Sequence, residues 1–168
     1  MAVRPVLRVP DPALKTVARP LGDEELDVAR RVAADLLDTM RAHPRCVGLA
    51  APQIGELVRV VAVDCTDHPR APDAAGLLLL VNPVIVEREG EEVAREGCLS
   101  LPELTANVRR AVAVAVEART PEGKPVALRS RGFEARCIQH ELDHLDGVLF
   151  LDRVDSLRRD VFRRKSYG

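Results

Sequence analysis

Apolar residues recur at helical spacing in two segments of the chain. Over residues 23–43 they come every three or four positions, with acidic residues in the first turn and a proline directly after the segment, which predicts an amphipathic helix. Residues 132–146 show the same spacing, and Gly147 follows where a left-handed glycine commonly ends a helix. A short basic helix is also expected over residues 155–165.

Extended segments separate the first two helices. Residues 57–64 and 77–87 are aliphatic and β-branched runs on either side of a stretch rich in Pro and Asp, which predicts two strands. Residues 108–120 alternate in polarity and are followed, after a Pro-Glu-Gly-Lys turn, by another extended run at 125–129, a pattern typical of a β-hairpin. The order of elements predicts an α+β fold with antiparallel or mixed sheets around the helix at 132–146.

Length and composition narrow the range of functions. A chain of 168 residues suits one domain over residues 1–168. The 25 Lys and Arg are balanced by 26 Asp and Glu, and aromatic residues are few, so DNA binding is not expected. The sequence shows neither a membrane-length apolar run nor the apolar core of a signal peptide, so we expect a cytoplasmic protein without membrane attachment.

The second helix contains His140-Glu141-Leu142-Asp143-His144, which fits the HExxH pattern. Two histidines four positions apart project from one helix face and can bind a common ion. Glu141 then lies beside the metal, where its carboxylate can take a proton from water and pass it to a leaving group, the chemistry of a metal-dependent hydrolase. The alternative is that these are ordinary polar residues on a solvated helix face, because so short a pattern also occurs by chance.

A catalytic site of this kind needs a third protein ligand and a fourth position open to water. Downstream, Phe150 occupies the position of the third histidine in extended zinc-protease motifs, and no glutamate follows Glu141. Cys137 lies about 10 Å of helix rise from His144, too far for both to bind one ion, and is expected to line the site or the core. Cys98, in a glycine-containing loop upstream, is either the third ligand or a small buried hydrophobe.

Three segments together resemble the signature of peptide deformylases. They are Val47-Gly48-Leu49-Ala50-Ala51-Pro52-Gln53, Glu96-Gly97-Cys98-Leu99-Ser100 and Gln139-His140-Glu141-Leu142-Asp143-His144. Further similar segments are Pro10-Asp11-Pro12, Asn82-Pro83 and the run from His144 to Phe150, so the resemblance spans nearly the whole chain. It implies a hydrolase that removes the formyl group from the N-terminal formylmethionine of nascent peptides and releases formate.

The resemblance also implies roles for individual residues. Cys98, His140 and His144 would bind the metal, which is ferrous iron in this family with zinc, nickel or cobalt as substitutes. Glu141 would be the general base and acid. The side-chain amide of Gln53 and the backbone N–H of Leu99 would bind the formyl oxygen, where negative charge develops. The residues expected to contact the substrate are Gly48, Val47, Gly97, Phe133, Cys137 and Arg109.

Two further features of the chain bear on its function. Cys46 stands where the family usually has glycine, and because cysteine tolerates positive φ poorly, either its backbone is ordinary or the pocket entrance differs from that of relatives. The basic C-terminal segment, residues 158–165, is a candidate contact with the ribosome near its exit tunnel.

Two other functions are compatible with part of the pattern. A metalloprotease that cuts internal peptide bonds would share the metal and Glu141, but an upstream cysteine ligand disfavours it. A catalytically silent relative that binds formylated peptides is disfavoured because Glu141 and Gln53 are both present.

Overall fold

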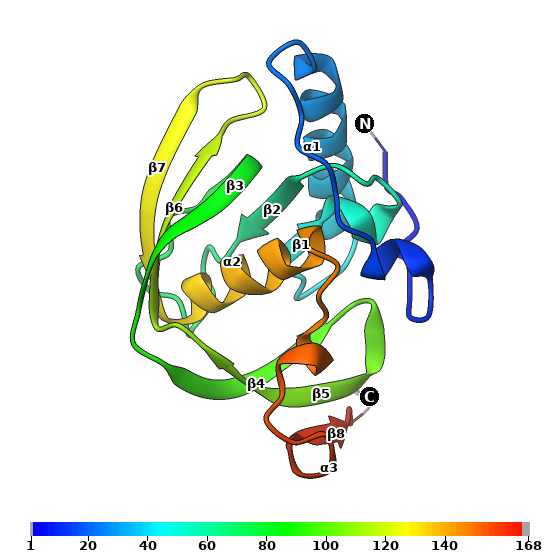
Figure 1. Ribbon diagram of the computed structural model, residues 1–168, viewed down its shortest axis with the longest axis vertical. Helices are drawn as coiled ribbons and strands as arrows, with labels where there is room; N and C mark the ends of the chain where they lie inside the picture. The colour runs from blue at the N-terminus through cyan, green and yellow to red at the C-terminus, as the bar shows by residue number, and fades with distance from the viewer. Residues whose placement is uncertain (1, 166–168) are drawn as a thin grey trace.

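The computed structural model describes residues 2–165, which form two sheets and three α-helices (Figure 1). The helices are α1 Leu26–Arg41, α2 Gly132–Leu145 and α3 Leu157–Asp160, with short 3-10 helices at Pro12–Lys15, Ala51–Ile54 and Phe150–Arg153. The strands are β1 Gly48–Ala50, β2 Val60–Asp64, β3 Leu77–Glu89, β4 Glu92–Cys98, β5 Leu101–Arg110, β6 Ala113–Arg119, β7 Pro125–Arg131 and β8 Val161–Arg163.

Helix α2 lies at the centre of the fold, between the larger sheet and the smaller one (Figure 1). The larger sheet has the strand order β1-β2-β3-β6-β7 and the smaller one β4-β5-β8, and neighbouring strands in both are antiparallel. The predicted α+β class, with antiparallel sheets around this helix, is confirmed. Within residues 2–165, the structure offers no helix with the length and apolar character needed to cross a bilayer.

Strand β2 links the cores on the two faces of the larger sheet. Val60 and Ala62 pack with the buried face of α1, whereas Val61 and Val63 pack with α2 residues such as Ile138. Successive strand residues point to opposite faces, so one strand contributes to both cores. This double packing fixes α2, and with it the HExxH motif, against the sheet.

Most of the predicted elements are present. Helix α1 begins three residues later and ends two residues earlier than predicted, and α2 ends at Leu145, followed by Gly147 with the expected positive φ of 70°. Strands β2 and β3 and the β6–β7 hairpin also match, although residues 108–110 belong to β5 in the smaller sheet rather than to the hairpin.

The prediction of a helix over residues 155–165 is wrong beyond residue 160. Ser156 caps a single helical turn by accepting a hydrogen bond from the Arg159 N–H, and the chain then becomes β8. Strand β8 pairs with β5, with Phe162 opposite Thr105. The free edge of β5 offers backbone hydrogen bonds that outweigh the weak local preference of so short a segment for helix.

Candidate active site

Three potential metal ligands converge from two elements. His140 and His144 lie one turn apart on α2, and Cys98 is the last residue of β4. The ligand atoms of the three lie within 4.8 Å of one another, and the Cys98 Sγ is 3.4 Å from the His144 Nε2. All three residues are buried, which excludes a solvated helix face for the two histidines. One thiolate and two imidazoles form a donor set suited to zinc or ferrous iron, so this site can bind a metal.

A tight reversal between β4 and β5 brings Cys98 to α2. Leu99 and Ser100 form the turn, and the register of the two strands shifts between Gly97 and Cys98. Cys98 therefore ends a strand, instead of lying in the glycine-containing loop that was predicted. The irregularity turns its side chain toward the buried helix.

Glu96 orients one of the two histidines. Its Oε1 lies 2.9 Å from the His140 Nδ1, which leaves the other ring nitrogen of His140 available as a ligand atom. Burial acts to raise the pKa of Glu96, but hydrogen bonds from His140 and Arg110 outweigh it and hold this pKa well below its usual range. Sequence reasoning missed this role of Glu96, although the residue stands two positions before Cys98 in the same motif.

Glu141 is buried beside the potential ligands. Within residues 2–165 its Oε1 has no hydrogen-bond partner, and burial raises its pKa to about 7 despite the opposing effect of His140. The carboxylate fits there because position 48 is glycine: a Cβ at Gly48 would lie only 2.6 Å from the Glu141 Oε2. A carboxylate with a pKa near neutrality can both accept and donate a proton.

The side chain of Gln53 is fixed at both ends. Its Oε1 accepts a hydrogen bond from the Ala50 N–H at 3.0 Å, and its Nε2 donates to the Ser100 Oγ at 3.1 Å. The same nitrogen lies 3.5 Å from the Cys98 Sγ. This arrangement holds an N–H donor next to the metal-binding residues.

A cavity of about 740 Å³ lies next to these groups. Its lining includes the potential ligands Cys98 and His140 together with Glu141 and Gln53. It also includes Leu99, the predicted backbone donor, and five of the six residues predicted to contact the substrate: Val47, Gly48, Gly97, Phe133 and Cys137. The structure therefore brings these residues together around one space.

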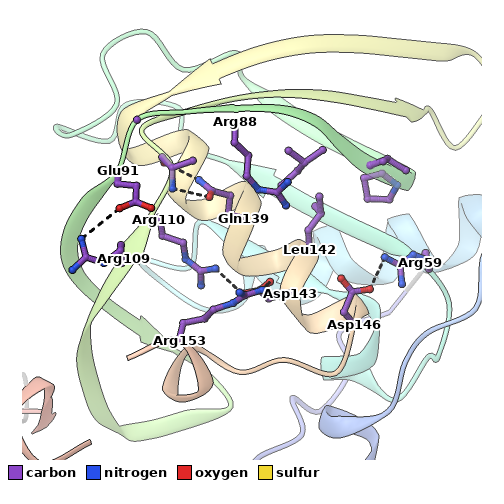
Figure 2. A pocket seen from close by; sticks show the side chains of 15 residues that line it. Arg59, Arg88, Glu91, Arg109, Arg110, Gln139, Leu142, Asp143, Asp146 and Arg153 are labelled. Carbon is purple, nitrogen blue, oxygen red and sulfur yellow. Dashed lines mark hydrogen bonds and ion pairs between the residues drawn. The ribbon is translucent and has the colours of Figure 1, made fainter. Parts of the chain in front are cut away.

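Arg109 does not line this cavity, so its contact with the substrate stays a prediction. It lines a second cavity, of about 720 Å³, on the face of α2 that carries Gln139 and Asp143 (Figure 2). Its Nη2 lies 2.8 Å from an Asp155 carboxylate oxygen. The physical reason is strand alternation: the next residue, Arg110, points into the protein toward Glu96, so Arg109 points outward.

A buried network connects the floor of the second cavity to the metal-binding residues. Arg110 donates two hydrogen bonds to the Glu96 carboxylate and one, at 2.5 Å, to Asp143. Asp143 also accepts hydrogen bonds from Arg153, which is half exposed at the cavity (Figure 2). This network, which sequence reasoning missed, holds α2 and β5 together next to His144.

Cys46 has an ordinary backbone conformation, which is one of the two alternatives predicted for it. The left-handed residue of this loop is Arg45, with φ 71°. The Cys46 thiol donates a hydrogen bond to the Gly48 carbonyl oxygen at 3.2 Å, and burial raises its pKa to about 12. The thiol is therefore protonated at neutral pH.

Comparison with known proteins agrees with this geometry. The polypeptide deformylase family matches the chain over residues 3–160. The chain belongs to this family. The peptide deformylase of Xylella fastidiosa (strain M12) is 41% identical over 98% of the chain and 95% of its own length.

Solved structures of relatives have the same fold. A class I type b peptide deformylase from Acinetobacter baumannii, crystallised with Met-Ala-Ser bound, is 37% identical and covers 91% of the chain and 99% of its own, with a TM-score of 0.83. The peptide deformylase of Thermus thermophilus is 40% identical with a TM-score of 0.81, over 91% of the chain and 86% of its own.

Membership of this family confirms the predicted reaction. Peptide deformylases are metal-dependent enzymes that hydrolyse the formyl amide on the N-terminal methionine of newly made proteins, and the chain is an enzyme of this kind. The two alternatives considered from the sequence, a protease of internal bonds and a silent peptide-binding relative, are not supported.

Proposed function

We propose that Glu141 carries the protons in this deformylation and that Cys98, His140 and His144 bind the metal. The observation that carries the proposal is a buried carboxylate next to a Cys-His-His cluster. A divalent cation at such a site supplies a Lewis acid and makes water more acidic. The residues of the chain then position the reactants and move the proton.

Glu141 takes a proton from water as the water oxygen bonds to the formyl carbon. The same carboxyl then gives this proton to the amine nitrogen as the carbon–nitrogen bond breaks, which yields formate and a free methionine N-terminus. Burial, which acts to raise the pKa of Glu141, suits this carboxyl to both transfers.

Gln53 and the backbone N–H of Leu99 stabilise the formyl oxygen as it gains negative charge. Gln53 suits this role because Ala50 and Ser100 hold its amide nitrogen beside Cys98, one of the metal-binding residues. The methionine side chain lies against Val47, Phe133 and Cys137, which line the cavity. A relative that binds Met-Ala-Ser supports a peptide with N-terminal methionine as the ligand.

The test of this mechanism is formate release from a formyl-methionyl peptide by Glu141→Gln, with the metal content measured on the same sample. We expect kcat to fall by a factor of about 10³, within the usual range for loss of a general acid–base group, while bound metal is retained. Glu117→Gln, on the exposed side of β6, is the matched control. Undiminished kcat in Glu141→Gln would refute the assigned role.

Ferrous iron is the metal we propose, by resemblance to the family and because one thiolate with two imidazoles suits it. A thiolate-ligated ferrous ion is sensitive to oxygen, so protein purified without air should be more active than protein purified in air. Adding ferrous iron without air to the protein purified in air should restore its lost activity. Equal activity of both preparations, each with zinc bound, would exclude iron as the native metal.

We further propose a cytoplasmic enzyme, acting as one catalytic domain over residues 1–168, that contacts the ribosome through its basic C-terminal segment. Arg158 and Arg159 of α3 are exposed. Replacing both with Glu should weaken co-sedimentation with ribosomes at low salt, because charge reversal opposes binding to phosphates. The control is Arg30→Glu, an exposed position on α1. Unchanged co-sedimentation of the double variant would refute the contact.

A further inference from the structure

The mouth of the active-site cavity carries several arginines from separate elements. Arg70 follows β2, Arg95 lies in β4 and Arg164 comes directly after β8. We call these three residues the arginine rim; Arg45 lines the same cavity. The cavity is thus strongly basic at its edge, although the whole chain has a formal net charge of −1.

The acidic residues that line the cavity do not neutralise the rim. They are Glu96 and Glu141, both buried. Glu96 is already bound by Arg110, Arg136 and His140. Ion pairs among residues 2–165 involve none of the three rim arginines.

Arg164 is placed by the pairing of β8 with β5. Its backbone N–H donates to the Glu103 carbonyl at 2.7 Å, and its side chain lies over Gly97, where a Cβ would collide with the guanidinium. The Arg164 Nε is buried and has no hydrogen-bond partner within the part of the chain that the structure describes. The side chain lines the cavity and lies over Gly97, the residue before Cys98 in β4.

Arg95 and Arg70 are held by groups that leave their charge uncompensated. Arg95 donates to the Asn107 Oδ1 at 3.1 Å and the Thr105 Oγ1 at 3.3 Å, and its Cζ lies 3.9 Å from the centroid of the Phe162 ring. The Arg70 Cζ lies 4.9 Å from the ring centroid of Phe133, in the wall of the cavity. Neutral acceptors and aromatic faces fix an arginine without cancelling its positive field.

We propose that the arginine rim binds acidic side chains that follow the formylmethionine, so that the enzyme prefers substrates with Asp or Glu among the next residues. This inference rests on the proposed function, because it places the formyl group next to Glu141. The peptide then leaves the cavity at about 3.3 Å per residue, and its second to fourth residues pass the mouth. The rim borders the same cavity as the catalytic groups, which favours the substrate over RNA as the ligand.

The test compares two amidated peptides, formyl-Met-Ala-Asp-Ala-NH₂ and formyl-Met-Ala-Asn-Ala-NH₂, which differ in one charge at nearly constant shape. An exposed ion pair contributes up to about 1 kcal/mol, roughly a fivefold preference. With one or two rim contacts, kcat/KM should be about three- to tenfold higher for the Asp peptide at low salt, and the ratio should fall toward one in about 0.5 M salt because of screening.

Substitutions at Arg164 and at its neighbour Arg163 test whether the arginine rim causes the preference for the Asp peptide over the Asn peptide. Arg164→Ala should lower the Asp-to-Asn ratio, and Arg164→Lys should retain more of it, whereas Arg163→Ala, exposed on the neighbouring position of β8, should leave the ratio unchanged. A structural defect alone would lower both rates equally and leave the ratio intact, which would count against the inference.

The possible results distinguish failure of the acidic preference from failure of the proposed function. Release of formate from neither peptide would refute the proposed function itself. Equal release from both by the wild-type enzyme would refute only the acidic preference. Binding of a short single-stranded RNA through Arg164, together with a ratio of one, would assign the rim to RNA instead.

Discussion

At position 48 the absence of a side chain determines where the catalytic carboxylate can lie. A Cβ there would lie 2.6 Å from the Glu141 Oε2 and 3.0 Å from its Cδ. Gly48→Ala should therefore displace Glu141 and lower kcat by a factor of about 10², the usual cost of moving a reacting group by about 1 Å. The measurement is steady-state kinetics on metal-loaded protein.

The melting temperature and metal content of Gly48→Ala are the controls for this prediction. Gly48 does not have a positive φ, so alanine should be tolerated by the backbone and both controls should stay close to the wild type. A fully active Gly48→Ala would mean that Glu141 has room to lie elsewhere and that its observed position is not the working one.

The sequence predicts the role of a residue well when its partners lie in the same short motif. His140, Glu141 and His144 could be predicted because their spacing on a helix already brings them together. The partner of His140 could not, because Glu96 reaches it only through the folding of β4 onto α2. The position of Arg109 at the second cavity could not be predicted for a related reason: without the register of β5, sequence alone does not say which of two adjacent arginines points inward.

Among the elements, the strands with few apolar residues were the hardest to predict. Strand β4 contains Glu92, Arg95 and Glu96, so it lacks the apolar alternation of a half-buried strand. Its polar residues are instead satisfied by ion pairs and hydrogen bonds to β5 and α2. The extended conformation of β4 and β5 therefore depends on tertiary contacts, which the local sequence pattern does not predict.

The buried network between β5 and α2 should contribute measurably to the free energy of unfolding. Arg110→Met should lower the free energy of unfolding by about 3 kcal/mol, because it leaves Glu96 and Asp143 buried with one cation fewer. Arg153→Met removes another partner of the same Asp143, but Arg153 is half exposed and the loss should be below about 1 kcal/mol. Urea denaturation of both variants measures the difference, and equal losses would contradict the buried network.

The start of α1 provides a pH-dependent contribution to stability. Hydrogen bonds from Arg19 and then from the Gly22 N–H lower the pKa of Glu25 to about 2. Because the folded pKa is depressed, the stabilisation is fully present above the unfolded pKa, near 4.5, and is lost as the pH falls toward 2.

Glu25→Gln should therefore lower stability at pH 7, and the gap from the wild type should narrow between pH 4.5 and pH 2. Thermal unfolding at several pH values measures this gap. Glu122→Gln, exposed in the β6–β7 turn, is the control and should follow the wild type throughout. A gap that stays constant with pH would show that Glu25 acts through something other than its charge.

At the scale of the whole molecule, the metal site joins two parts of the fold that also meet through the buried network of Glu96, Arg110 and Asp143. Cys98 belongs to the smaller sheet, whereas His140 and His144 belong to the helix packed on the larger one. An ion bound to all three residues connects the sheets directly. Binding to the folded state alone stabilises a protein by mass action, so the site that performs the reaction should also contribute to stability.

Removal of the metal should therefore lower the melting temperature as well as abolish activity. At a free metal concentration of about 1,000 times Kd the linkage amounts to about 4 kcal/mol, which for a chain of this size corresponds to a shift of about 10 °C. Cys98→Ser, which lacks the thiolate ligand, should melt lower from the start and respond little to chelator. If chelation abolishes formate release without changing the melting temperature, the three ligands must already be held in place by the protein, with Glu96 and the Arg110 network sufficient to fix α2 against β4.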